Sequence, residues 1–331
     1  MTDSPRPAAR LRALDGLRGV AAVGVVISHL VVATNVALAS QFFEAPQALT
    51  GFAWLIAETP LSIFWAGQEW VFVFFVLSGF VLSLAAAGGA RFDAARYYPT
   101  RVVRLYLPVW AMLVLAALLH EVVAHEPVAG ATPWLNLHAT GFSATTTLHE
   151  LVLLVDPGDY YYSTVLWTQQ WEVGFSIALP LFILCARRFP LLLLGTASLL
   201  VITLGGAELG LLRYVPMFTL GTVLAFGREH VVRALADNRL YAVTLAASPV
   251  LLTAANWMPE GPWEGLDFGM AALGASGLVA TAMVPGPFGR WLQTRPLQAV
   301  GIRSYSLYLV HEPIIVTTAF ALGGRPSTLV L

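Results

Sequence analysis

Residues 17–38 read LRGVAAVGVVISHLVVATNVAL, an apolar run that carries two ionisable side chains, Arg18 and His29. A run of this length crosses the hydrocarbon core of a bilayer as a helix. Eleven helical steps of about 100° close to within about 20° of whole turns, so both side chains share one face, roughly 16 Å apart along the axis. We expect the guanidinium near one membrane surface and the imidazole close to the midplane. Ionisable groups at such depth are costly and usually functional, so this pair marks the expected chemistry.

Composition indicates an integral membrane protein. Of the 331 residues, 57% are hydrophobic and 11% are charged, whereas an average soluble domain is about 25% charged. The mean hydropathy is +0.72. The net charge of −1 gives no reason to expect nucleic acid as a partner. A single cysteine, Cys185, excludes a disulfide framework and a thiolate metal cluster.

Nine apolar runs are long enough to be membrane helices. They lie near residues 17–38, 68–87, 102–124, 164–186, 190–206, 211–226, 240–257, 268–284 and 302–322. The stretch 50–65 is also apolar but is interrupted by Glu58 and Pro60, which predicts a short interfacial or re-entrant piece. The sequence therefore predicts an all-α, polytopic transmembrane bundle that forms one domain over residues 1–331.

The arginines predict the orientation of this bundle, because cytoplasmic segments of membrane proteins are enriched in basic residues. With a cytoplasmic N-terminus, the nine spans leave only Arg213 and Arg325 outside. The inside segments and helix ends hold Arg6, Arg10, Arg12, Arg18, Arg91, Arg96, Arg101, Arg104, Arg187, Arg188, Arg228, Arg233, Arg239, Arg290, Arg295 and Arg303. A cleaved signal peptide ending near Ala37-Leu38-Ala39 is the alternative for the N-terminus. We favour an uncleaved signal anchor, because it keeps the alternation in step.

Two arginines, Arg101 and Arg104, lie three residues apart at the cytoplasmic mouth of the third span. This spacing points both guanidiniums to one side of a helix. Guanidiniums match phosphate oxygens bidentately, so Arg18, Arg101 and Arg104 together fit a phosphorylated cytosolic ligand. The alternative is ordinary cytoplasmic charge that anchors the helices.

Glu172 lies about eight residues into the fourth span, at a depth that we estimate to match that of His29. We therefore expect the two side chains to meet. A carboxylate that holds one imidazole nitrogen fixes the tautomer and raises the basicity, which suits a general base for a hydroxyl. A structural hydrogen bond between helices is the alternative.

Other polar side chains carry weaker signals. Ser78 and Gly79 favour close helix packing over a nucleophilic serine. The last span contains Tyr305, Tyr308 and His311, which we expect either to line a cavity or to form interhelical hydrogen bonds. Four histidines near the outer segment 124–163 have no compact ligand spacing, so we predict no metal site. They are His120, His125, His138 and His149.

Five motifs follow one another along the chain. They are LDGLRG at 14–19 with His29, FFVLSGF at 74–80, the Arg101/Arg104 pair, LWT at 166–168 leading to Glu172, and SYSLYLVH at 304–311. In this order, over residues 14–313, they resemble the signature of the acyltransferase-3 family of bacterial membrane O-acyltransferases.

The resemblance implies an enzyme that transfers an acyl group, commonly acetyl from acetyl-CoA, to a hydroxyl. The acceptor would be a carbohydrate, a cell-envelope glycan or a small glycosylated metabolite, and the location the bacterial cytoplasmic (inner) membrane. We expect His29 to act as the base and Glu172 as its partner or as a second acid/base group. Arg18, Arg101 and Arg104 would grip the CoA phosphates. Residues expected to line the substrate cavity are Ser78, Trp167, Tyr305 and His311.

The chain departs from the family pattern in three places. Val173 stands where a second acid is often found, and Glu312 stands where a tryptophan frequently follows the last-helix histidine. A tenth span is expected after Leu322, whereas the sequence given ends at Leu331, so the last helix is expected to be missing. The alternative function is a secondary transporter of a small polar or acylated solute. Such a carrier would be expected to contain an internal repeat, and no motif is repeated between the two halves.

Overall fold

The computed structural model describes residues 12–42, 47–139, 141, 143–153, 160–205, 212–258 and 265–324. Within these ranges every regular element is helical, which confirms the predicted all-α fold. Arg6, Arg10 and Arg325, used above for the orientation, lie outside the described residues. The longer helices are α1 (Arg12–Thr34), α4 (Gly67–Ala87), α5 (Ala94–Val122), α8 (Leu166–Arg188), α9 (Leu191–Gly205), α10 (Tyr214–Phe226), α12 (Asn238–Leu252), α14 (Leu266–Ala282) and α16 (Arg295–Ala321). The shorter ones are α2 (Val36–Ala39), η1 (Ser40–Phe42), α3 (Gly51–Ala57), η2 (Pro60–Phe64), α6 (Pro133–Leu137), α7 (Ala144–Val152), α11 (Arg228–Ala234), α13 (Ala254–Trp257) and α15 (Pro287–Leu292).

Each of the nine apolar runs corresponds to one of the longer helices. Four of these, α1, α4, α5 and α8, are long and apolar enough to cross a membrane, and α9, α10 and α14 are shorter apolar helices. Large apolar side chains are exposed on the outer surface of the bundle. Leu192 and Leu204 of α9, for example, are 81% and 80% exposed. A surface of this kind suits lipid tails, which are as apolar as leucine. The chain is thus an integral membrane protein with several membrane helices.

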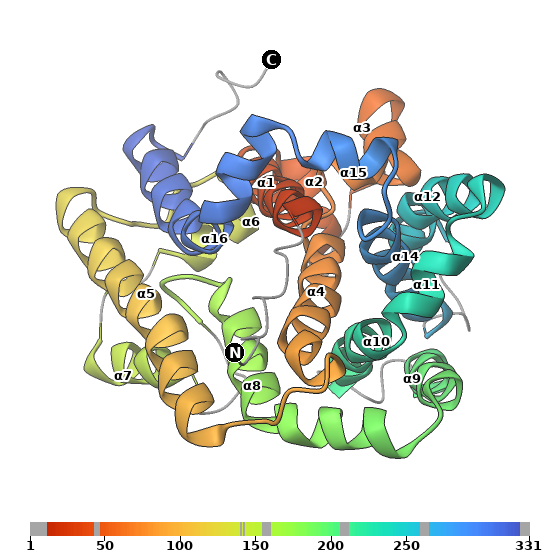
Figure 1. The fold of residues 1–331 in the computed structure, drawn as a ribbon. Helices are drawn as coiled ribbons and strands as arrows, with labels where there is room; N and C mark the ends of the chain where they lie inside the picture. The colour runs from red at the N-terminus through yellow and green to blue at the C-terminus, as the bar shows by residue number, and fades with distance from the viewer. Residues whose placement is uncertain are drawn as a thin grey trace.

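Helix α4 lies at the centre of the bundle and packs against α1, α8, α10 and α14 (Figure 1). Glycines allow the closest of these approaches. A Cβ atom on Gly79 would collide with the carbonyl oxygen of Phe218, and one on Gly221 would collide with that of Val76. The close-packing role predicted for Gly79 is therefore confirmed, and it draws α10 against the helix that carries Ser78.

Helices α1 and α16 are joined in the same way. A Cβ atom on Gly301 would collide with the carbonyl oxygen of Asp15, and one on Gly19 would come too close to that of Leu297. The two long helices, red and blue in Figure 1, consequently lie side by side. This contact sets the polar side chains of α16 beside Arg18 and His29.

The first helix differs from the expected range of 17–38, because it begins at Arg12 and ends at Thr34. Its end is marked by Asn35, whose side chain caps the next helix by accepting a hydrogen bond from the backbone N–H of Leu38. His29 therefore lies five residues before the C-terminal end of α1. The predicted depth of the imidazole, close to the membrane midplane, stays a prediction.

Candidate active site

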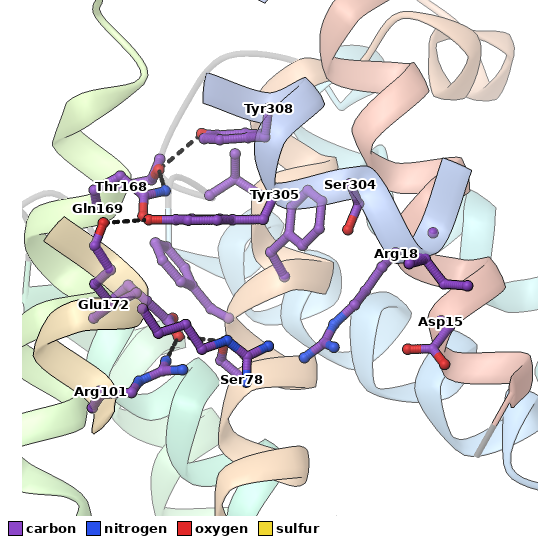
Figure 2. A pocket seen from close by; sticks show the side chains of 17 residues that line it. Asp15, Arg18, Ser78, Arg101, Thr168, Gln169, Glu172, Ser304, Tyr305 and Tyr308 are labelled. Atoms are coloured by element: carbon purple, nitrogen blue, oxygen red, sulfur yellow. Dashed lines mark hydrogen bonds and ion pairs between the residues drawn. The ribbon is translucent and has the colours of Figure 1, made fainter. Parts of the chain in front are cut away.

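A cavity of about 180 Å³ opens among α1, α4, α5, α8 and α16. Its wall combines apolar residues such as Phe74 and Phe75 with many polar side chains, most of which are labelled in Figure 2. The polar lining residues are Asp15, Arg18, Ser78, Arg101, Arg104, Thr168, Gln169, Glu172, Ser304, Tyr305 and Tyr308. Six predicted site residues, from five helices, are thus brought together: Arg18, Ser78, Arg101, Arg104, Glu172 and Tyr305.

Arg101 and Glu172 form an ion pair across the α5–α8 contact. Their side chains are 10% and 14% exposed, so the pair is largely shielded from solvent. The Nε of Arg101 also donates to the Ser176 hydroxyl at 2.8 Å. The Ser78 hydroxyl donates to Oε1 of Glu172 at 2.9 Å. Glu172 therefore holds the Arg101 guanidinium in place at the cavity wall.

Arg18 and Arg104 also line the cavity, where Arg18 reaches inward from α1 (Figure 2). No hydrogen bond or ion pair joins either guanidinium to another residue in the described part of the chain. Guanidiniums bind anions that carry several oxygens, so a cavity lined by three of them has the chemistry for such a ligand. The three arginines thus line one cavity, and their binding of a phosphorylated ligand stays a prediction.

His29 lies beyond this cavity and hydrogen-bonds to the last long helix. Its Nδ1 is 2.7 Å from Nε2 of His311, and Nδ1 of His311 is 3.1 Å from the carbonyl oxygen of Leu307. A carbonyl only accepts, so Nδ1 of His311 carries the proton and Nε2 of the neutral ring accepts. Nδ1 of His29 must then donate. The hydrogen-bond network thus leaves the lone pair of His29 on Nε2, the atom that a general base would use.

A buried carboxylate hydrogen-bonds to several residues that surround the two histidines. Glu312, next to His311, is fully buried. It accepts hydrogen bonds from His138 Nε2, Ser163 Oγ, Thr164 N, Thr164 Oγ1 and Val165 N, at 2.6–3.0 Å. These contacts tie α16 to α6 and to the start of α8. Trp134, one turn before His138, stacks on the His29 ring with 5.3 Å between centroids. The imidazole is consequently fixed from two sides.

Tyr308 lies between the cavity and the histidines. Its side chain lines the cavity, its hydroxyl is 2.8 Å from that of Thr168, and its ring centroid is 5.9 Å from that of His311. Neither His29 nor His311 is among the described residues that line the cavity. Arg18 lines the cavity and His29 hydrogen-bonds to His311 behind it, with the Tyr308 side chain between the cavity and the histidines.

The expected contact between Glu172 and His29 was wrong. Glu172 binds Ser78 and Arg101, whereas the hydrogen-bond partner of His29 is His311. Depth along a helix does not say which neighbour a side chain faces. Helix α8 packs against α4, α5 and α10, whereas α1 packs mainly against α16 and α4. The carboxylate nearest to the histidine pair is Glu312, which hydrogen-bonds to His138.

Two other expected cavity residues lie elsewhere. Trp167 packs against Phe75 and Tyr214, with ring centroids 6.2 and 5.2 Å away, and His311 lies behind Tyr308 as described. Sequence reasoning missed Gln169, Thr168 and the stacking residue Trp134. Gln169 precedes Glu172 by three residues, so helical spacing from the known acid was the available signal. No pattern pointed to Trp134. Over the ranges that the structure describes, no group of three or more His, Cys, Asp or Glu residues could hold a metal ion.

Comparisons with known proteins fit this arrangement. No solved structure matches the chain. O-acetyltransferase PaAT-1 from Phomopsis amygdali is 24% identical in an alignment of 392 positions, which covers 94% of this chain and 73% of that protein. The acyltransferase domain of the acyltransferase-3 family matches residues 11–330. The chain therefore belongs to the acyltransferase-3 family and is an acyltransferase.

Proposed function

We propose that this chain is a membrane-bound O-acyltransferase that uses cytosolic acyl-CoA, with acetyl as the acyl group. The acceptor is a hydroxyl of a carbohydrate, a cell-envelope glycan or a small glycosylated metabolite. The protein is a single domain of nine spans with its N-terminus in the cytoplasm of a bacterial cell. One observation carries the proposal: three guanidiniums face one cavity, and a histidine with a free Nε2 lies past its far wall.

The arginines are suited to the phosphates of CoA. Arg101 lies seven residues into α5, about 10 Å along the axis, so the cavity is reached from the end of the bundle where α5 begins. Arg18 and Arg104 have no hydrogen-bond or ion-pair partner in the described ranges, and Arg101 is presented by Glu172. Planar guanidiniums bind phosphate oxygens bidentately, which supports binding of the 3′-phosphate and the 5′-diphosphate.

In the proposed reaction, Nε2 of His29 takes the proton of the acceptor hydroxyl. The hydroxyl oxygen then attacks the thioester carbonyl carbon and forms the ester bond. The carbon–sulfur bond breaks, and the CoA sulfur leaves with the proton that His29 held. His311 acts as a positioning residue, because it accepts from Nδ1 of His29 and keeps the lone pair on Nε2.

The arm of CoA must pass Tyr308 before its thioester meets His29. The Tyr308 side chain lines the cavity and contacts His311. We infer that it turns away from Thr168 when the donor enters. Glu172, ion-paired to Arg101, orients the phosphate-binding group in this scheme instead of exchanging a proton with the substrate.

The test is acyl transfer by purified protein in detergent, with radiolabelled acetyl-CoA as the donor. We expect transfer, or slow thioester hydrolysis in the absence of an acceptor, and we expect His29→Ala to abolish both while CoA still binds. Solute flux into liposomes that does not depend on CoA, with no acyl transfer, would instead support a carrier and would refute the proposal.

A further inference from the structure

We propose that Gln169 is a binding residue for the pantetheine arm of the acyl donor, and that its side-chain carbonyl accepts a hydrogen bond from an amide N–H of that arm. The inference rests on the proposed function, because it takes the donor to be acyl-CoA. It assigns a residue to the part of the donor that the arginines do not reach.

The amide of Gln169 is buried without a full set of partners. The residue is 6% exposed and lines the cavity, and its Oε1 has no hydrogen-bond partner among the residues that the structure describes. Its Nε2 makes one long contact, 3.4 Å, to the Thr168 hydroxyl. Buried polar atoms in proteins are nearly always hydrogen-bonded, and an unpaired acceptor is costly. A ligand that brings an N–H or O–H group would remove that cost.

Thr168 does not supply the missing donor, even if the amide is turned over. Its only hydroxyl hydrogen goes to the carbonyl oxygen of Val165, at 2.8 Å. The hydroxyl of Tyr308, also 2.8 Å away, must therefore donate to Thr168. Either orientation of the Gln169 amide leaves the carbonyl oxygen without a donor from Thr168. The Gln169 carbonyl oxygen therefore receives no hydrogen bond from Thr168 in either orientation of the amide.

The position of Gln169 fits the middle of a bound donor. It precedes Glu172 by three residues, so both side chains lie on one face of α8, and Glu172 holds Arg101. Thr168, the next residue toward the start of α8, touches Tyr308. Gln169 therefore lies between the phosphate-binding arginines and the Tyr308 barrier (Figure 2). Pantetheine runs from the diphosphate to the thioester and carries two secondary amides, each with one N–H donor.

The test compares two ligands and two variants of the full-length protein. CoA carries the phosphates and the arm, whereas 3′-phosphoadenosine 5′-diphosphate carries the phosphates alone. We expect Gln169→Leu to weaken CoA binding about 3- to 10-fold, the effect of one neutral hydrogen bond. Binding of 3′-phosphoadenosine 5′-diphosphate should stay unchanged. Gln170→Leu is the matched control, because Gln170 accepts from Tyr160 and does not line the cavity.

Stability and kinetics provide the remaining readouts. Gln169→Leu should melt no lower than the wild type, because it removes a buried unpaired group, and Gln169→Met serves if leucine does not fold. The KM for acetyl-CoA should rise while the KM for the acceptor stays constant. Equal CoA affinity in the wild type and both variants, equal weakening for both ligands, or a rise in the acceptor KM alone would overturn the role. Failure of the wild type to bind either ligand would instead overturn the proposed function, and this role with it.

Discussion

Replacing Arg101 and Arg104 by alanine, one at a time, should separate two roles. We propose that both residues bind phosphate, whereas Arg101 also forms an ion pair with Glu172. Arg104 has no hydrogen-bond or ion-pair partner among the described residues, so Arg104→Ala leaves the free energy of unfolding unchanged or higher. Arg101→Ala leaves the carboxylate of Glu172, 14% exposed, without its cation. Removing one partner of a buried ion pair costs about 3–5 kcal/mol. Each substitution should also remove a charge-assisted hydrogen bond to phosphate of about 1.5–3 kcal/mol, which is about a 10- to 100-fold loss of CoA affinity.

The assay pairs a CoA titration with thermal unfolding in the same detergent. Both variants should bind CoA more weakly than the wild type, but only Arg101→Ala should unfold at a lower temperature. The double variant Arg101→Met/Glu172→Leu removes both charges, so it should recover stability while CoA binding stays weak. Unchanged CoA affinity in both single variants would contradict the phosphate role. An equal loss of stability in both would contradict the pairing of Glu172 with Arg101 alone.

Three further outcomes follow from the geometry. His311→Phe removes the acceptor for Nδ1 of His29, so kcat should fall about 100-fold or more with CoA affinity unchanged; equal kcat in a steady-state assay would remove His311 from the account. Gly301→Val should prevent recovery of folded protein by size-exclusion chromatography because of the collision with Asp15, whereas Gly174→Ala, with open space around its Cβ, should be tolerated. Burial raises the pKa of Glu150 from 4.5 to about 7. Between these two pH values the folded state keeps a proton that the unfolded state loses. The free energy of unfolding should therefore fall by about 3 kcal/mol as the pH rises from 4.5 to 7. Glu150→Gln keeps the acceptor for the Tyr161 and Tyr162 N–H groups and should flatten that fall in pH-dependent melting curves; an unchanged slope would show that Glu150 is not its source.

Periodicity along single helices was enough to predict much of the site. The spacing of Arg101 and Arg104 predicted one side of a helix, and both residues line the cavity. Apolar length likewise predicted the all-α fold. These properties depend on one helix at a time, which is why the sequence alone conveys them.

Contacts between helices were not predictable in this way. The matched depths of Glu172 and His29 suggested a pair, but helix packing turns Glu172 toward Arg101 and gives His29 a partner on α16. Tyr308 was one of several polar residues in a motif, and its place in the cavity wall depends on the packing of α16 beside Thr168 of α8. The proposed role of Gln169 depends on its buried carbonyl oxygen in the cavity wall, which only the packing of the helices determines.

An experimental structure with CoA bound would test the central claim most directly. We predict the phosphates on Arg18, Arg101 and Arg104, the arm beside Gln169, the Tyr308 side chain turned away from Thr168, and the sulfur next to Nε2 of His29. CoA bound outside this cavity, or sulfur still separated from His29 by an unmoved Tyr308, would contradict the account.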